Sequence, residues 1–228
     1  MFHVKRSAAR GDVSRETMLV LMEQELRRLE RVTTWAGATL DDEQIQRLAA
    51  YATWLTEEAI PAGGIGPDEG SRIWDRHICD SLAFAAAWRD GRPGTAADLG
   101  SGVGLPGIPL AILWPDTRWS LIDRSRRRVE LARRAIRILD VDNVRAYAED
   151  FKRHRTGHEA VVARGVLSPR QLLEDIGDVL SPGGRIAVGL TRSGSEEKWT
   201  ESRGKVIEVP PEVLDGGGKI LIIDSRDR

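Results

Sequence analysis

The chain has 228 residues, which is enough for one complete α/β domain with a helical extension. Its 34 basic and 35 acidic residues nearly cancel, so a nucleic-acid partner would have to bind a local basic patch. Cys79 is the only cysteine, which excludes an intrachain disulfide and a cysteine-rich metal site, and we expect no bound metal.

The sequence also predicts a protein that stays off membranes. No apolar run approaches the roughly 20 residues needed to cross a bilayer. The first residues, Met1–Arg6, lead into polar sequence and lack the apolar core of a signal peptide. The lone cysteine fits a reducing compartment, so we expect a cytoplasmic protein, and we expect it to be a monomer.

Helices dominate the first part of the chain. We predict a loose tail over residues 1–13, a helical extension over 14–92 and an α/β core over 93–228. A first helix starts at Ser14, and a second starts at Thr39–Asp42, which resembles a capping box. Apolar residues at helical spacing mark the buried faces of these two helices: Met18, Met22, Leu26 and Leu29 in the first, and Ile45, Leu48, Ala52 and Leu55 in the second.

After a third predicted helix, Ile73–Trp88, strands and helices alternate along the chain. The predicted strands cover residues 95–97, 119–123, 144–147, 160–163 and 185–190, and the predicted helices cover 108–113, 125–139 and 169–180. Two further strands, 205–209 and 219–223, are hairpin-like and would supply an antiparallel edge. The alternation predicts an α/β fold with a mostly parallel sheet and helices on both faces.

A glycine-rich loop follows the first predicted strand. Gly100, Gly102 and Gly104 alternate there, and Asp98 stands two residues before the first of them. A dinucleotide fingerprint has the spacing Gly-x-Gly-x-x-Gly, so this loop differs from it. The loop suits a ligand with an amine and a sulfonium, and we expect Asp98 to reach the amino acid end of S-adenosylmethionine. The alternative is an ordinary tight turn.

A second acid follows at the end of the next strand. Asp123 stands 25 residues after Asp98 and could accept both ribose hydroxyls of a nucleoside. The alternative is that Asp123 caps the helix that follows. The order of strand, loop, helix, strand and acid favours the cofactor site.

Several motifs resemble one known family. The stretches that carry the resemblance are Arg76–Leu82, Asp98–Ala111, Leu121–Asp123, Arg126–Val129, Ala148–Glu149 and Val161–Arg164. Together they are similar to the family of ribosomal RNA small subunit methyltransferase G, also called glucose-inhibited division protein B. The resemblance covers about residues 45–190 and implies a class I S-adenosylmethionine-dependent methyltransferase, with a Rossmann-like sheet over 95–224.

The resemblance also implies an activity and a cofactor site. The family transfers a methyl group from S-adenosylmethionine to N7 of a guanine in 16S ribosomal RNA, within the small ribosomal subunit. Ala148 and Glu149 would flank the adenine, and Arg164 would close the site. The complete set expected to bind the cofactor is Asp98, Gly100, Ser101, Gly102, Gly104, Leu105, Asp123, Ala148, Glu149 and Arg164.

The chain departs from the family pattern on the substrate side. It has Gly63, Gly64 and Ile65 where the family usually has Asn-Leu-Thr. It has Gly189 in the fifth strand where the family usually has a lysine. Two other functions therefore stay open: a methyltransferase acting on another RNA position or on a small molecule, and a cofactor-binding protein without catalysis.

Candidate catalytic residues are few, which fits the expected reaction. Guanine N7 has a free lone pair, so no base is needed to deprotonate it, and catalysis is mainly alignment. We assign Arg164 and His77 to catalysis, with a strand-end ion pair and a structural histidine as the alternatives. We expect Asp80 and Ser81 to fix their helix against the glycine loop.

Basic residues gather after Asp123. Seven arginines fall within residues 124–137, and a second basic cluster covers 152–155. The alternatives are a solvated helix face and a phosphate-binding surface for structured RNA. The residues that we assign to RNA binding are Arg76, Arg124, Arg126, Arg127 and Arg128.

Overall fold

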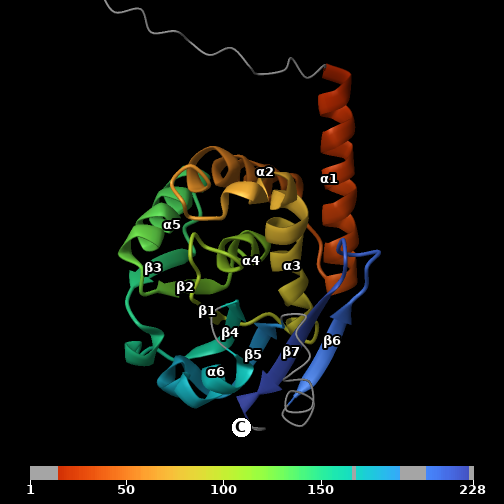
Figure 1. Cartoon of the computed structure of the whole chain (residues 1–228). Helices are drawn as coiled ribbons and strands as arrows, with labels where there is room; N and C mark the ends of the chain where they lie inside the picture. Colours follow the sequence, from red (N-terminus) through yellow and green to blue (C-terminus); the bar gives the residue numbers. More distant parts are fainter. Residues whose placement is uncertain (1–14, 166–167, 191–203, 226–228) are drawn as a thin grey trace, which may run out of the picture.

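A computed structural model describes residues 15–165, 168–190 and 204–225 (Figure 1). Its centre is a seven-stranded sheet with the order β3-β2-β1-β4-β5-β7-β6. The strands are β1 (Thr95–Leu99), β2 (Arg118–Asp123), β3 (Val144–Ala148), β4 (His158–Arg164), β5 (Leu180–Gly189), β6 (Lys205–Val209) and β7 (Gly218–Asp224). The first five are parallel, and β7 runs antiparallel to both of its neighbours. The predicted antiparallel edge is confirmed: β7 lies between β5 and β6, and β6 is the outermost strand.

Helices precede the sheet and connect its strands. The α-helices are α1 (Arg15–Ala36), α2 (Asp42–Trp54), α3 (Asp80–Ala83), α4 (Gly107–Leu113), α5 (Arg126–Leu139) and α6 (Pro169–Asp175). The shorter helical turns are η1 (Leu55–Ala59), η2 (Pro67–Arg72), η3 (Ile73–Cys79), η4 (Phe84–Trp88), η5 (Phe151–Arg153) and η6 (Gly177–Val179). The predicted alternation of strands and helices is therefore confirmed.

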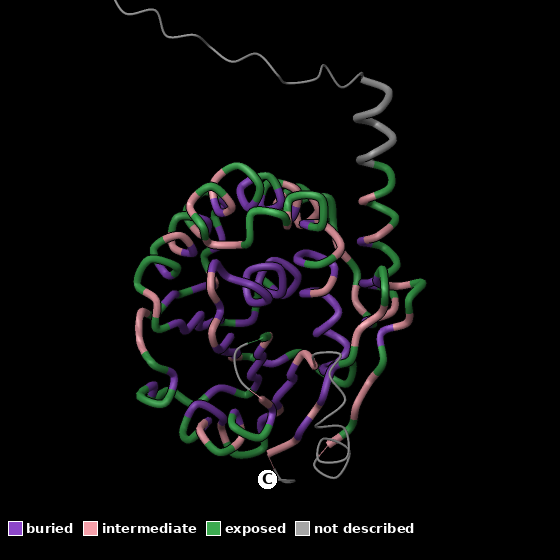
Figure 2. The backbone as a smooth tube through the Cα atoms, viewed as in Figure 1, coloured by how far each residue is buried: buried purple, intermediate pink, exposed green. Residues whose placement is uncertain are grey.

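The sheet separates two hydrophobic clusters. Figure 2 shows the buried residues concentrated in the centre of the molecule. The larger cluster joins α1–α5 to one face of the sheet, and the smaller joins α6, η5 and η6 to the other. Neighbouring strand residues alternate between the clusters, so Ala96 packs in the larger and Ala97 in the smaller. Both sheet faces are covered, as the class I methyltransferase fold predicts.

The N-terminal helices differ from the predictions in detail. Leu29 of α1 is buried but Leu26 is 43% exposed, so the predicted apolar stripe is only partly buried; the side chains of Met18 and Met22 lie outside the described residues. The capping box lies two residues later than predicted, because Asp41 accepts from the Gln44 backbone while the Gln44 side chain accepts from Asp41. Asp41, and not Thr39, is the N-cap of α2, and it has the extended backbone that an N-cap requires.

Two other element boundaries also differ. The predicted helix Ile73–Trp88 is helical throughout but divides into η3, α3 and η4, with three different hydrogen-bond spacings. The predicted helix 169–180 stops at Asp175, and Leu180 already begins β5. Leu180 pairs with His158 and Arg185 pairs with Ala160, so the register shifts between them and β5 is irregular across residues 181–184.

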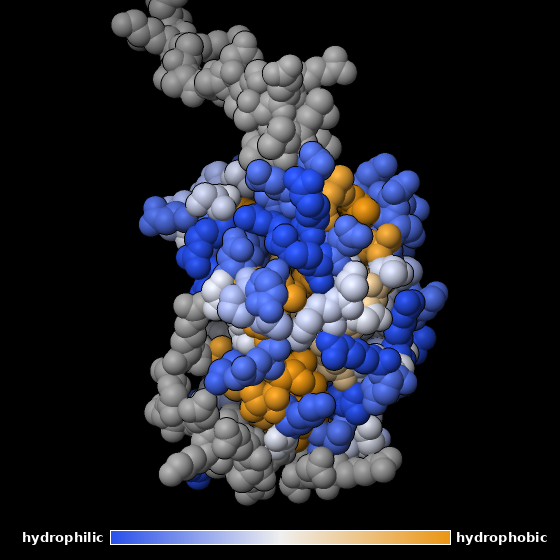
Figure 3. Space-filling model, turned by 90° about the vertical axis from the view of Figure 1, so that its right-hand side faces the viewer, coloured by the Kyte–Doolittle hydropathy of each residue, from blue (hydrophilic) through white to orange (hydrophobic). Residues whose placement is uncertain are grey.

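The β6 side of the molecule combines charged and apolar surface. Figure 3 shows apolar residues gathered in the lower half of this face, bordered by hydrophilic residues. In the strand itself, Val206 and Ile207 are half-buried between the exposed Lys205 and Glu208. Among the described residues, no helix combines the length and the apolar character needed to span a membrane.

Candidate cofactor site

The predicted cofactor residues come together at the carboxyl ends of the parallel strands. In the sheet register Asp98 of β1 pairs with Leu121, Asp123 of β2 pairs with Ala148 of β3, and Arg164 of β4 pairs with Gly189. Ligands of such sheets bind outside these strand ends, near the point where the strand order reverses. Here the reversal lies between β1 and β4, so the predicted residues lie where a ligand is expected.

The glycine loop folds back onto β2. Gly100 donates its backbone N–H to the Ile122 carbonyl at 2.7 Å, which holds the loop over the end of the neighbouring strand. Gly102 has a φ of +57°, a conformation that favours glycine, and a Cβ added there would meet no atom closer than 3.9 Å. Only the flexible Arg128 side chain lies beside the Gly102 backbone at this distance, which leaves room for close approach of a ligand.

Asp98 lies beneath this loop. Its side chain is fully buried, and its Oδ2 accepts the backbone N–H of Gly107, the first residue of α4, at 2.7 Å. Burial raises its pKa to about 7, against the lowering effects of the Gly107 N–H and the Arg164 cation. Asp98 thus joins β1 to α4, a role that the sequence motif did not predict. Its direct contact with the cofactor stays a prediction.

Asp123 ties the two loops of the site together. Its Oδ2 accepts the Gly102 N–H at 2.9 Å, and its Oδ1 accepts the Ser125 N–H at 2.7 Å. The alternative role as a helix cap is wrong, because the side chain of Ser125 caps α5. Each carboxylate oxygen keeps a further lone pair, so both can still accept a ribose hydroxyl.

Two buried oxygens fit the expected cofactor. Asp98 Oδ1 and Ser101 Oγ are buried and have no hydrogen-bond partner within the described part of the chain. Such groups are costly when they stay unpaired, so they favour a ligand that supplies donors. The ammonium and the hydroxyls of S-adenosylmethionine supply them, and the residues present therefore fit this cofactor.

Arg164 joins the end of β4 to the N-terminal helices. Its Nη1 donates to Asp80 Oδ2 at 2.8 Å and to the Arg76 carbonyl at 3.0 Å. The predicted alternative, an ion pair at the end of the strand, is therefore present. The pair is half-buried, since the Arg164 side chain is 20% exposed. Asp80 therefore fixes η3 and α3 to β4 and not to the glycine loop; Ser81 instead donates within its own helix, to the His77 carbonyl. The expectation for Asp80 and Ser81 was wrong.

His77 lies near Arg164 but faces another partner. Its Nε2 is 3.1 Å from Glu69 Oε2, and its Nδ1 is buried without a partner among the described residues. Burial lowers its pKa, the nearby Arg164 cation lowers it further, and Glu69 acts in the opposite direction. A neutral His77 that pairs η3 with η2 has a structural role in this geometry, and its catalytic role stays a prediction.

The departures from the family pattern have packing explanations. A Cβ at Gly64 would lie 2.5 Å from the Val103 side chain, so Gly64 lets its loop lie directly on the glycine loop. A Cβ at Gly189 would lie 3.1 Å from the buried Phe84 ring and 3.5 Å from Arg164. The space beside Arg164 that a longer side chain would need is therefore taken by Phe84.

Glu149 follows β3 and contacts the buried His154, which in turn contacts the buried His158. Its Oε1 is 2.6 Å from His154 Nδ1, and His154 Nε2 is 3.2 Å from His158 Nε2. Since a carboxylate only accepts, His154 donates from Nδ1 and, when neutral, accepts the Nε2 proton of His158. Burial, with His154 beside it, lowers the pKa of His158 to about 4, which keeps His158 neutral at pH 7. His154 therefore orients the Glu149 carboxylate.

The arginines assigned to RNA binding are exposed but differ in their contacts. Arg124 and Arg126 have no hydrogen bond or ion pair within the described part of the chain. Arg127 instead donates to the Ala62 carbonyl, and Arg128 is 3.8 Å from Asp123. The Arg76 carbonyl accepts from Arg164, as noted above. Arg127 therefore also holds the segment around Ala62, and Arg128 lies near Asp123 of the cofactor site, contacts that the charge pattern did not predict.

Tyr51 is a site residue that the sequence analysis missed. It is fully buried, and its hydroxyl donates to the Val103 carbonyl of the glycine loop at 3.0 Å. The residue lies on the apolar face of α2, where an aromatic residue predicts only packing. In the described ranges no group of three or more histidine, cysteine or acidic residues has metal-binding geometry.

Comparisons with known proteins identify the family of the chain. The family model described as rRNA small subunit methyltransferase G matches residues 44–207. The ribosomal RNA small subunit methyltransferase G of Mycolicibacterium smegmatis is 37% identical over 158 residues, covering 68% of this chain and 66% of that protein. The protein of the same name from Leifsonia xyli subsp. xyli is 36% identical over 156 residues, covering 67% and 73%.

The matched region spans about two thirds of the length of these curated relatives. Among solved structures, TrmN from Thermus thermophilus is 21% identical with a TM-score of 0.49, covering 63% of this chain and 48% of that one. The family model covers well over half of the chain and includes the glycine loop, both site aspartates and Arg164. The chain belongs to the rRNA small subunit methyltransferase G family.

Proposed function

We propose that this protein transfers the methyl group of S-adenosylmethionine to N7 of a guanine in 16S ribosomal RNA. The single observation that carries the proposal is the site at the strand ends, where the open Gly102 backbone lies beside Asp123 and the unpaired oxygens of Asp98 and Ser101. Membership of the family supports the RNA substrate. S-adenosylmethionine supplies the electrophilic methyl group, and the protein's own residues supply binding and alignment.

Each residue of the site has a defined task. Asp123 holds the ribose, Ala148 and Glu149 flank the adenine, and Asp98 with Ser101 receives the amino acid end. Arg164 uses only Nη1 in its contacts among the described residues, so its other N–H groups stay available for a phosphate or a carboxylate. Because guanine N7 carries its own lone pair, these residues need to align the reactants and need not remove a proton.

We further propose that the protein acts as a cytoplasmic monomer on the small ribosomal subunit. Exposed Arg124 and Arg126 beside the site suit the phosphate backbone of that substrate. The other function classes predict different products. A methyltransferase of another RNA position would modify a different atom, and a cofactor-binding protein would transfer no methyl group.

The deciding experiment compares three acceptors. Purified protein and labelled S-adenosylmethionine are incubated with intact small subunits, with bare 16S ribosomal RNA and with transfer RNA as a control. The small subunits come from cells in which the gene is deleted. We expect one label per small subunit, mapped by mass spectrometry to N7-methylguanosine. Label at another atom, or tight cofactor binding without transfer to any RNA, would refute the proposal.

A further inference from the structure

A basic groove runs along the free edge of β3, beside α5. Its volume is about 350 Å³, and its lining includes Arg133, Arg137, Arg145 and Tyr147. This volume lies at the lower end of the range typical of small-ligand pockets. None of the residues that line it is acidic. The groove lies outside the strand-end site, on the side of α5 and β3 shown at the left of Figure 1.

The groove residues form two rows. Arg133 and Arg137 are four residues apart on α5, so they lie on one face of the helix. Arg145 and Tyr147 are two residues apart on β3, so both project from the same side of the strand, about 7 Å apart. Val144 and Ala146 face α5, so Arg145 and Tyr147 project from the opposite side of β3. The two rows meet around the free edge of β3, where both line the groove.

Two of these arginines protect the edge strand. Arg133 donates to the Ala146 carbonyl from Nε at 3.1 Å and from Nη2 at 2.7 Å. Arg145 donates to the Val144 carbonyl at 3.0 Å. With these outward carbonyls covered by side chains, the edge is closed to an added β-strand, so a peptide paired along β3 is disfavoured. The positive charge instead favours an anionic ligand.

Arg137 is the cation left free for such a ligand. Arg133 also pairs with Glu130 at 2.6 Å, and Arg145 is held by backbone carbonyls. Arg137 is exposed and makes no hydrogen bond or ion pair within the described residues. A free guanidinium at the end of a basic channel suits a phosphate group.

Tyr147 supplies the second element of recognition, an exposed and fixed aromatic ring. It is 38% exposed, and among the described residues few large apolar side chains are as exposed. Its ring packs edge-on against His154, with centroids 5.4 Å apart and planes at 64°. His154 is itself held by Glu149 and His158, so the tyrosine ring rests on an ordered support. A supported ring with open area is suited to base stacking.

We propose that this groove binds one unpaired nucleotide of the RNA substrate, with its base stacked on Tyr147 and a phosphate on Arg137. The proposal rests on the proposed function for the identity of the RNA. Tyr147 directly precedes the Ala148–Glu149 segment expected at the adenine, so the bound nucleotide is a neighbour of the target guanine and not the target. Recognition through stacking and phosphate contact tolerates different bases.

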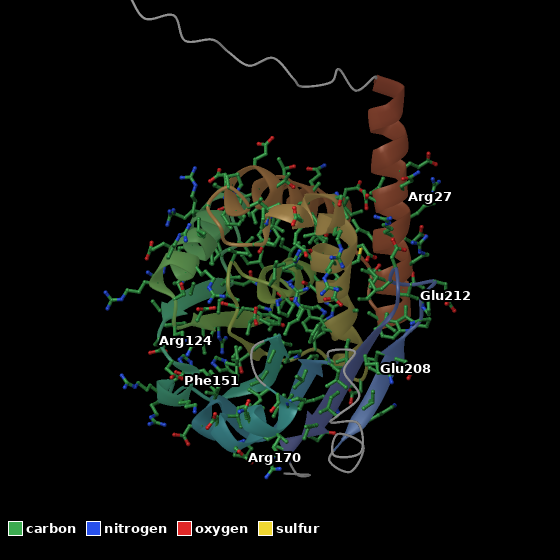
Figure 4. The ribbon with its side chains drawn as sticks, viewed as in Figure 1. Arg27, Arg124, Phe151, Arg170, Glu208 and Glu212 are labelled. Carbon is green, nitrogen blue, oxygen red and sulfur yellow. The ribbon has the colours of Figure 1, made fainter. Side chains whose placement is uncertain are left out.

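The test measures RNA binding separately from methyl transfer. Fluorescence anisotropy reports the affinity of the full-length protein, saturated with S-adenosylhomocysteine, for a labelled 12-nucleotide single-stranded RNA. Tyr147→Leu is expected to weaken binding about fivefold or more, while Tyr147→Phe, which keeps the ring, binds as the parent does. Arg137→Gln is expected to flatten the slope of log affinity against log salt by about 0.7. The matched control is Arg170→Gln on α6, well away from α5 and β3 in Figure 4.

The outcomes separate this proposal from the proposed function. Photocrosslinking of 4-thiouridine RNA to the Tyr147 peptide, together with the expected losses, supports the groove even if no methyl group is transferred. Unchanged RNA affinity and salt slope in both groove variants, with normal cofactor binding, overturn it even if the parent protein methylates small subunits. Equal losses in Tyr147→Phe and Tyr147→Leu also overturn it, since stacking does not need the hydroxyl.

Discussion

Replacing Asp98 by asparagine tests whether the buried carboxyl under the glycine loop carries a proton at neutral pH. The asparagine keeps an oxygen that can accept the Gly107 N–H, and it removes the charge. The folded protein raises the pKa of Asp98 from the ordinary 3.8 to about 7. Between these values the folded chain holds a proton that the unfolded chain has released, so rising pH lowers the free energy of unfolding of the parent protein.

The size of the effect follows from the difference in pKa. Each pH unit corresponds to about 1.4 kcal/mol, so the difference of roughly three units gives about 4 kcal/mol. The free energy of unfolding of Asp98→Asn minus that of the parent should therefore rise by about 4 kcal/mol between pH 4 and pH 8. The unpaired amide group of asparagine adds an offset that does not depend on pH.

Urea unfolding at one-unit intervals from pH 4 to pH 8 measures this difference. Other titrating groups cancel when the two proteins are compared, provided that they do not interact with Asp98. A difference that stays constant to within about 1 kcal/mol would show that Asp98 titrates normally in the folded state. A difference that falls with pH would show that Asp98 is stabilised as an anion, and the reasoning from its burial would be refuted.

Three further predictions concern packing, catalysis and RNA binding. Gly107→Ala places a Cβ 2.3 Å from a leucine methyl of β2, so we expect the free energy of unfolding to fall by about 1–3 kcal/mol, as thermal unfolding can measure. Gly91→Ala is the control that should not change it, because no atom lies within 4 Å of a Cβ there. Arg164→Ala should lower the rate of single-turnover methyl transfer at least about tenfold, while a cooperative melting transition shows that the fold is kept. Arg164→Lys should restore little of this rate, because lysine lacks the planar fork of donors. Full activity of the lysine variant would contradict this role. Replacing Arg124 and Arg126 by alanine should flatten the salt dependence of small-subunit binding by about two units of slope and leave cofactor affinity unchanged, as calorimetry can check; an unchanged slope would identify a solvated helix face.

The sequence was sufficient to predict the sheet and the position of the site, for local reasons. The periodicity of apolar residues that distinguishes strands from helices depends only on residues close together in the sequence. The strands of the core accordingly lie where they were predicted. Asp98, the glycine loop and Asp123 lie within one strand-helix-strand unit, so their proximity follows from the topology.

The contacts that support the site could not be predicted, because they join distant segments. Asp80 and Arg164 are 84 residues apart, and Tyr51 and Val103 are 52 residues apart. Only the packing of the N-terminal helices on the sheet brings them together. The side-chain partners of Arg127 likewise depend on a loop 65 residues earlier, so charge pattern alone predicted an exposed cation.

The strand order has a consequence for how the molecule assembles. β7 pairs with β5 on one side and with β6 on the other, although β6 precedes it in the chain. β6 therefore has no strand to pair with until residues 218–224 are in place. During synthesis this end of the sheet can form only after residues 218–224 have been made. A chain interrupted before residue 218 would lack β7, leave β6 without a partner and expose the edge of β5. The unpaired edge of β5 would then expose backbone groups to other chains, so such fragments are expected to aggregate.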